Sequence, residues 1–196
     1  MKGLILDTSH TPFISLSSQG ELISSCEPSH HTSSSYAQDI DLFLKKQRLA
    51  LQDLSYLAVG IGPGTFLGTR IGVIIAKTFS YALPLPLVTF CSLRAYQGVS
   101  SYPVISDAKS KGVYLFESGN LSLCSAEDLQ QLLPLFPCFL SPTQEALLSK
   151  FPFLSQDNCL QRPPSLTFLA QHTYQKALNG DFTEQQNLEI PYLRLS

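Results

Sequence analysis

The stretch best suited to chemistry is the glycine-rich segment that starts at Gly60, because backbone amides in such a segment can hold a phosphate. The apolar run before it, Leu57–Val59, predicts a buried strand, so the glycines occupy a turn from a strand into a helix. A Walker loop would need a glycine where Leu67 or Thr69 stands, and a dinucleotide fingerprint would need one at Thr65 or Leu67. The spacing therefore excludes both motifs.

Other residues that could carry catalysis or bind a metal give little support for either. The chain has four histidines: His10, His30, His31 and His172. They form neither an HExxH motif nor a His-x-x-x-His pair, so we expect no metal site. Asp7 closes the first predicted strand, which suits a phosphate-orienting acid but also suits a residue that caps a turn. We expect no catalytic residue and no cofactor, with Asp7, Thr8 and Ser9 at most a vestigial phosphate loop.

A stripe of small residues follows the turn along the predicted helix, at Gly64, Gly68, Gly72 and Ala76. Four residues advance a helix by about 400°, so these positions form one slowly winding line without side chains. Glycine inside a helix costs about 1 kcal/mol relative to alanine, so we expect the stripe to allow close approach of another backbone. That backbone can belong to the protein itself or to a partner.

The elements around this helix predict the fold class of the first half. A meander of three strands is expected near Leu4–Leu6, Phe13–Leu16 and Glu21–Ser24, and a first helix begins near Tyr36. Strand, helix, strand and helix follow up to Gly98, which gives the order βββαβαβα. This order predicts an α/β fold with a mixed sheet covered by helices, as in a ribonuclease H-like domain.

Signals weaken after residue 100. Strands are predicted near 104–106 and 113–116, and helices over 125–133 and 165–178. We recognise no second copy of the βββαβαβα unit in this half. The expected organisation is therefore an N-terminal lobe over residues 1–100 and a shortened C-terminal lobe over residues 101–196.

Composition and charge exclude some classes of function. The 196 residues are 44% hydrophobic, enough for a sizeable core, and the net charge is −2 with 13 Lys and Arg. Such a chain has no basic field for nucleic-acid binding on its own, so any RNA contact is expected through a partner. Five cysteines without a CxxC pair indicate thiols. Neither a signal peptide nor a long apolar segment is recognised, so we expect a cytoplasmic protein away from the membrane.

Several stretches together resemble one family. They are Leu6–Ser9, His31–Thr32, Gly62–Gly72 with Ala76–Lys77, Asp107–Ala108 before Val113–Tyr114, and the terminal Pro191–Arg194. On these stretches the chain resembles the TsaB (YeaZ) family, subunits of the bacterial machinery that makes threonylcarbamoyladenosine (t6A) in tRNA. It departs from the usual family pattern at Thr65 and Leu67, where serine and threonine are common.

The resemblance implies an ASKHA fold, the actin and sugar-kinase class, built from two related lobes. It also implies a non-catalytic subunit that pairs with the transferase TsaD, and with itself, through its first two main helices, while the ATPase TsaE joins the assembled pair. TsaD modifies adenosine 37 of tRNA. The partner-interface residues expected on this basis are Tyr36, Ile40, Gly64, Phe66, Gly68, Arg70, Gly72 and Ala76.

A partner helix lying on the small-residue stripe would tolerate no long side chain there. We therefore expect Gly68→Gln to abolish pairing without unfolding the protein. The alternative class of function is a metallopeptidase-like or nucleotide-binding, kinase-like enzyme of the same fold, which the missing histidine pair and phosphate motifs oppose.

Overall fold

The computed structural model describes residues 1–29, 33–109 and 112–190. His30, His31, Thr32 and Pro191–Arg194, which entered the sequence analysis, lie outside the described residues. The chain forms two compact units, one of residues 1–92 with 166–190 and one that includes residues 93–165.

The first unit is built on a five-stranded sheet in the order β3-β2-β1-β4-β5. Its strands are β1 (Lys2–Asp7), β2 (Phe13–Ser18), β3 (Glu21–Cys26), β4 (Tyr56–Gly60) and β5 (Leu87–Phe90). The first three strands form the expected antiparallel meander, and β4 and β5 add parallel to β1. The carboxyl ends of β1, β4 and β5 therefore lie at one edge of the sheet.

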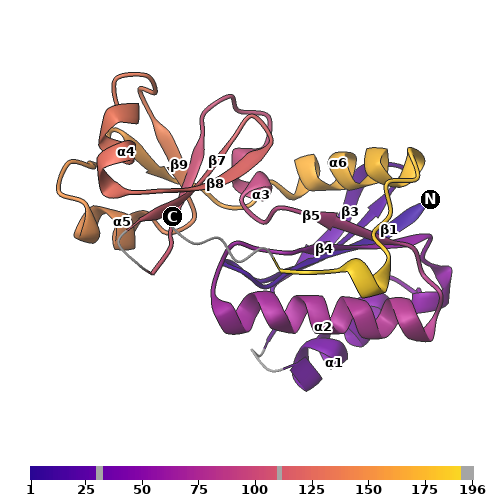
Figure 1. Cartoon of the computed structure of the whole chain (residues 1–196). Helices are drawn as coiled ribbons and strands as arrows, with labels where there is room; N and C mark the ends of the chain where they lie inside the picture. The colour runs from indigo at the N-terminus through magenta and orange to yellow at the C-terminus, as the bar shows by residue number, and fades with distance from the viewer. Residues whose placement is uncertain (30–32, 110–111, 191–196) are drawn as a thin grey trace. The chain divides into compact units, whose positions relative to one another are not determined.

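Helices cover both faces of this sheet (Figure 1). On one face lie α1 (Ser33–Lys46) and α2 (Phe66–Ala82), and on the other lies α6 (Leu166–Leu178). Two short 3-10 helices, η1 (Leu51–Asp53) and η2 (Gln185–Asn187), complete the unit. The predicted order βββαβαβα is confirmed, with α3 (Arg94–Gln97) as its last helix.

The second unit repeats this strand order in smaller elements. It contains β6 (Val104–Asp107), β7 (Val113–Glu117), β8 (Asn120–Cys124), α4 (Ala126–Leu132), β9 (Phe139–Ser141), α5 (Gln144–Lys150) and β10 (Cys159–Gln161). The sheet order β8-β7-β6-β9-β10 matches the first sheet strand for strand, including a meander and two parallel pairings. The prediction that no second copy exists was wrong. This lobe is reduced in the length of its elements, not in their order.

The two units exchange the helix that follows their last strand. The short helix α3 follows β5 but contacts β6 and β9, whereas α6 follows β10 but contacts β1, β3 and β5. Four residues of α6 are buried: Leu169, Ala170, Thr173 and Ala177. The compact units therefore differ from the expected division at residue 100, because the apolar side of α6 is buried on the first sheet.

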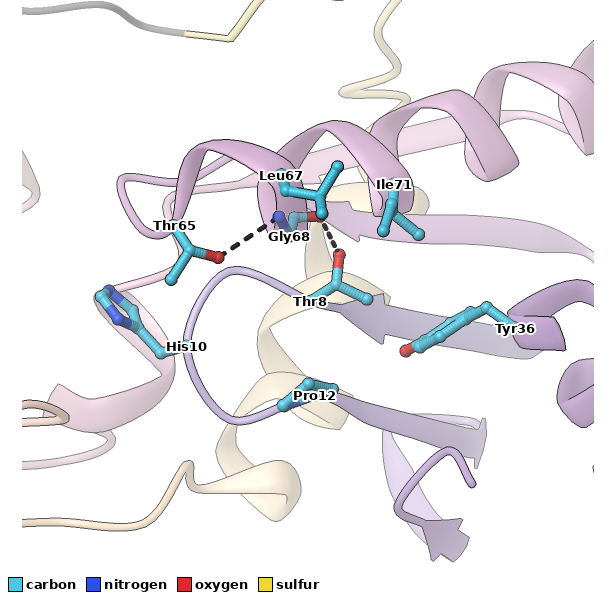
Figure 2. Close-up of a pocket in the computed structure, with 8 residues that line it drawn as sticks. All are labelled: Thr8, His10, Pro12, Tyr36, Thr65, Leu67, Gly68 and Ile71. Atoms are coloured by element: carbon cyan, nitrogen blue, oxygen red, sulfur yellow. Dashed lines mark hydrogen bonds between the residues drawn. The ribbon is translucent and has the colours of Figure 1, made fainter. Parts of the chain in front are cut away.

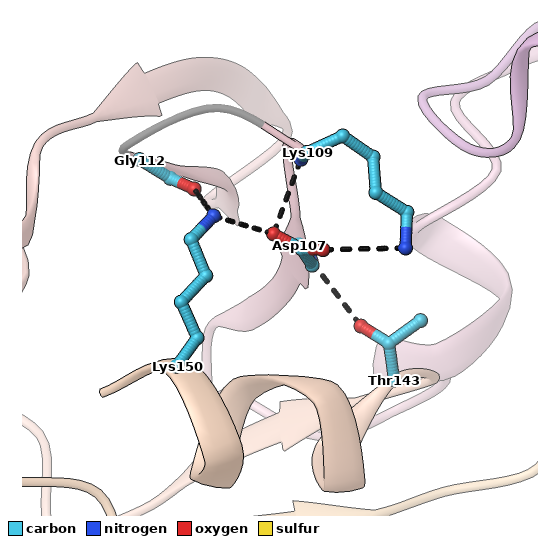
Figure 3. Close-up of polar contacts among 5 residues, drawn as sticks. All are labelled: Asp107, Lys109, Gly112, Thr143 and Lys150. Carbon is cyan, nitrogen blue, oxygen red and sulfur yellow. Dashed lines mark hydrogen bonds and ion pairs between the residues drawn. The ribbon is translucent and has the colours of Figure 1, made fainter. Parts of the chain in front are cut away.

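A carboxylate anchors the end of β6 in the second unit (Figure 3). The side chain of Asp107 is 9% exposed and accepts a 2.6 Å hydrogen bond from the ammonium of Lys150, which also donates to the Gly112 carbonyl. The amide and ammonium of Lys109 contact the same carboxylate, and Thr143 accepts from the Asp107 amide. Burial opposes ionisation, but the hydrogen bonds from Lys150 and Lys109 outweigh it and lower the pKa of Asp107.

We predict that this carboxylate stabilises the chain at neutral pH and ceases to do so in acid. A lowered pKa favours the folded state above the ordinary value of 3.8, and that stability is lost as the pH falls through the folded pKa. Asp107→Asn should therefore cost about 1–3 kcal/mol at pH 7 and progressively less below about pH 4. Urea unfolding followed by circular dichroism at several pH values measures this difference. A cost independent of pH would contradict the prediction.

Candidate functional site

The loop after β1 inserts a hydroxyl into helix α2. Thr8 Oγ1 donates a 2.5 Å hydrogen bond to the Gly68 carbonyl and accepts one of 3.0 Å from the Gly72 amide (Figure 2 shows the first). A Cβ at Gly72 would lie 2.6 Å from that hydroxyl oxygen, and one at Gly68 would overlap the Thr8 carbonyl. Glycine at both positions is thus what lets the loop reach the helix backbone.

Ser9, the next residue of the loop, also contacts the start of α2 and contacts Ser92 after β5. Its carbonyl accepts a 2.8 Å hydrogen bond from the Thr65 amide, at the start of α2, and a Cβ at Gly64 would lie 2.5 Å from that carbonyl. The Ser9 hydroxyl accepts from the hydroxyls of Thr69, at 3.3 Å, and Ser92, at 2.9 Å. Since Ser92 follows β5, this network connects the end of β1, the start of α2 and the end of β5.

Asp7 lies beneath this network and is 3% exposed. Burial raises the pKa of its carboxyl group, while the hydrogen bond from the Ser9 amide acts in the opposite direction. Its Oδ1 accepts a 2.8 Å hydrogen bond from the Ser9 amide, and a Cβ at Gly60 would overlap the carboxylate. The carboxyl is covered by the protein, so its geometry is that of a residue that stabilises the turn.

The stripe of small residues is therefore occupied by the chain itself. Gly64, Gly68 and Gly72 contact Thr8 and Ser9. This corrects the expectation that the stripe is a bare docking face.

Three more of the expected interface residues are buried, so none of them projects a side chain from the surface. Ala76 and Ile40 are 0% exposed and Tyr36 is 1% exposed. Ile40 is part of the core between the sheet and the helices, and Tyr36 donates a 2.7 Å hydrogen bond to the Phe13 carbonyl. Of the eight residues, Phe66 and Arg70 have exposed side chains.

The opposite side of α2 is an exposed apolar face. It carries Phe66 (62% exposed), Leu67, Ile74 and Tyr81 (83% exposed), and the Arg70 guanidinium lies 3.8 Å from the centroid of the Phe66 ring. Leu67, Ile74 and Tyr81 were not predicted as interface residues, because the glycine spacing points to the other side of the helix. Residues 66, 70, 74 and 81 share one side of a 3.6-residue helix, so a helical projection would have grouped them. Exposed apolar side chains gathered on one side of a helix make this face a candidate binding surface.

A small pocket opens beside the first turn of α2, with a volume of about 250 Å³. Figure 2 shows the residues that line it: Thr8, His10, Pro12, Tyr36, Thr65, Leu67, Gly68 and Ile71. Most of the surface is apolar, formed by Leu67, Ile71 and Pro12 together with the Tyr36 ring. The pocket joins the Thr8 loop, which the sequence suggested as a phosphate loop, to the start of the exposed face of α2.

Two mixed sheets of the same strand order, with helices exchanged at their ends, define an ASKHA-like α/β fold. A family model described as "TsaD: tRNA N6-adenosine threonylcarbamoyltransferase" matches residues 27–132, more than half of the chain. The chain therefore belongs to that family, and its relatives support the TsaB (YeaZ) group within it.

Among those relatives, the tRNA threonylcarbamoyladenosine biosynthesis protein TsaB of Bacillus subtilis is 35% identical over 83 residues, 37% of this chain and 36% of that protein. An uncharacterised protein of Mycobacterium tuberculosis is 38% identical over 68 residues, 34% of this chain and 32% of that protein. The matches thus span about a third of these relatives' length.

Two solved structures share the fold along nearly the whole chain. YeaZ from Pseudomonas aeruginosa superposes with a TM-score of 0.68 at 18% identity, covering 98% of this chain and 99% of that one. An uncharacterized protein described as similar to the peptidase YEAZ from the same organism gives a TM-score of 0.66 at 19% identity, with the same coverage.

Residues 1–29, 33–109 and 112–190 contain no group of three or more His, Cys, Asp and Glu that could hold a metal ion. None of the helices described in those ranges has the length and apolar character needed to cross a membrane.

We predict that Gly68→Gln lowers the free energy of unfolding. This is the reverse of the expectation from sequence, in which the variant stays folded and loses only its pairing. A side chain at residue 68 must displace the Thr8 loop, and such overpacking costs about 1–3 kcal/mol or more. Phe66→Gln, on the exposed face of the same helix, is the matched control and should change stability far less. Urea midpoints of the two variants test this, and equal midpoints would show that the stripe is not packed internally.

We also predict that the Thr8 hydroxyl, rather than its bulk, holds α2. Thr8→Val keeps the shape but removes both hydrogen bonds, which should cost about 1–3 kcal/mol. Thr8→Ser keeps the hydroxyl and should recover most of that loss. The free energies of unfolding of the two variants give the comparison, and a Ser variant as unstable as the Val variant would overturn the assignment.

Proposed function

We propose that this chain is a non-catalytic subunit required for t6A formation at adenosine 37 of tRNA, and that it pairs with and activates the TsaD transferase. The observation that carries the proposal is the family match together with the relative named for t6A biosynthesis. In this proposal TsaE joins the assembled pair, tRNA is contacted only through the complex, and the protein works in the cytoplasm.

The site supports a binding role more than a catalytic one. The Asp7 carboxyl is covered, and the hydroxyls of Ser9 and Ser92 are engaged with each other and with the backbone around them. The exposed face of α2, by contrast, presents apolar side chains and the Arg70 guanidinium to solvent. We assign the TsaD contact to this face, defined by Phe66, Leu67, Arg70, Ile74 and Tyr81. Self-pairing would use the same face and so compete with TsaD.

Reconstitution tests the proposal directly. TsaD, TsaE and the enzyme that forms the threonylcarbamoyl intermediate should modify tRNA when this chain is added, and the chain alone should make no t6A. The measurement is the t6A content of digested tRNA, with and without the chain. An unchanged yield without it would refute the proposal, and peptidase or ATPase activity of the purified chain that is lost in Asp7→Ala would favour an enzyme instead.

A further inference from the structure

The surface of the pocket beside α2 is mostly apolar, and two of the three hydroxyl groups that line it, those of Thr8 and Tyr36, already donate to backbone carbonyls. Thr8 Oγ1 is bonded to the Gly68 carbonyl and the Gly72 amide. Thr65 Oγ1 accepts from the Gly68 amide at 3.2 Å, and the Tyr36 hydroxyl donates to the Phe13 carbonyl at 2.7 Å. His10 also lines the pocket, but with the Thr8 and Tyr36 donors used and most of the remaining surface apolar, an apolar group suits this pocket better than a phosphate.

The size of the pocket restricts the occupant further. Sites for small molecules and cofactors measure about 300–1,000 Å³, so a volume of about 250 Å³ falls below the range for a nucleotide. One aliphatic or aromatic side chain is of the right scale. Figure 2 shows Leu67 and Ile71 projecting from α2 beside the pocket, which places it next to the exposed face of that helix.

The positive charge of Arg70 beside the pocket indicates that the occupant also carries a negatively charged group. Helix α2 contains no acidic residue, and its cations are Arg70 and Lys77. The guanidinium of Arg70 is held over the Phe66 ring, and Arg70 lies next to the pocket residue Ile71 and about one helical turn after Leu67. A carboxylate is the complementary group for a planar guanidinium at such a position.

We propose that this pocket receives one apolar side chain of the docking protein, and that the same protein places a carboxylate beside it for Arg70. The inference rests on the proposed function in that the docking protein is taken to be TsaD. A second copy of the chain fits less well, because its own α2 carries Arg70 and Lys77 but no acidic residue and so offers no carboxylate to Arg70 from this helix.

The first experiment tests the pocket without any partner. Benzene and inorganic phosphate are titrated separately into the intact protein while the methyl resonances of Ile71 and Leu67 are recorded by NMR. Benzene should shift these resonances and phosphate should not. Benzene is a suitable probe because it binds in cavities lined by apolar side chains. Shifts with phosphate and none with benzene would overturn the proposal in favour of an anion site.

The second experiment fills the pocket and measures the affinity for TsaD. Ile71→Phe should weaken binding by about tenfold or more, the effect of losing an anchor residue. Ile23→Phe is the matched control, since Ile23 is 52% exposed on β3, away from α2, and its variant should bind as the native chain does. Equal affinities of the two variants would overturn the pocket assignment, and a folded native chain that does not bind TsaD at all would instead refute the proposed function.

Charge reversal tests the carboxylate. Arg70→Glu should weaken TsaD binding by about tenfold or more and reduce its dependence on salt, whereas Arg70→Lys should retain most of the affinity. Binding of Arg70→Glu at native affinity would show that no carboxylate faces Arg70. Tighter binding of the native chain to itself than to TsaD would show that the face is built for a second copy.

Discussion

The Thr8 hydroxyl, held between the Gly68 carbonyl and the Gly72 amide, fixes how α2 lies on the first sheet. Because the loop after β1 approaches the helix backbone this closely, no side chain fits at Gly68 or Gly72 in α2 or at Gly64 just before it, and that requirement accounts for the glycines of the stripe. With the glycine side committed to the loop, the apolar residues on the other side have no sheet to cover them. Phe66 and Ile74 are left in solvent by the same constraint that seats the helix, and this gives the protein a surface suited to a partner.

The two units share a strand order, but different groups surround the carboxylate at the end of the first strand of each. Each has a carboxylate at the end of its first strand, where parallel strands end in an open α/β sheet and where ligands of this fold class bind. In the first unit Asp7 is enclosed by hydroxyl groups and by a loop packed on glycine. In the second unit Asp107 is neutralised by Lys150 from α5 and by Lys109. In both units the carboxylate holds a turn in place, which agrees with a subunit whose contribution is a binding surface.

Sequence patterns were sufficient where elements are long or strongly alternating. The meander, the strand before Gly60 and the seventeen-residue α2 were all predicted, since apolar periodicity and proline termination leave little choice. The second copy of the fold was missed because β9 and β10 have three residues each, too few to show a period, and β9 is flanked by Pro137 and Pro142. The stripe predicted that something approaches the helix closely, but spacing cannot say whether that backbone is internal. The loop containing Thr8 and Ser9, distant in sequence, decides it.

Helix α2 has an internal glycine side, and we propose that its external side binds TsaD. Ile74 and Ile75 are adjacent in sequence, yet Ile74 is 56% exposed and Ile75 is 4% exposed. Methyl cross-saturation NMR on the complex with TsaD therefore provides a direct test within one helix. The account predicts strong saturation transfer from TsaD to the Ile74 methyl groups and none to those of Ile75. Transfer to neither residue in a folded, TsaD-bound chain would contradict it, because TsaD would then bind another surface.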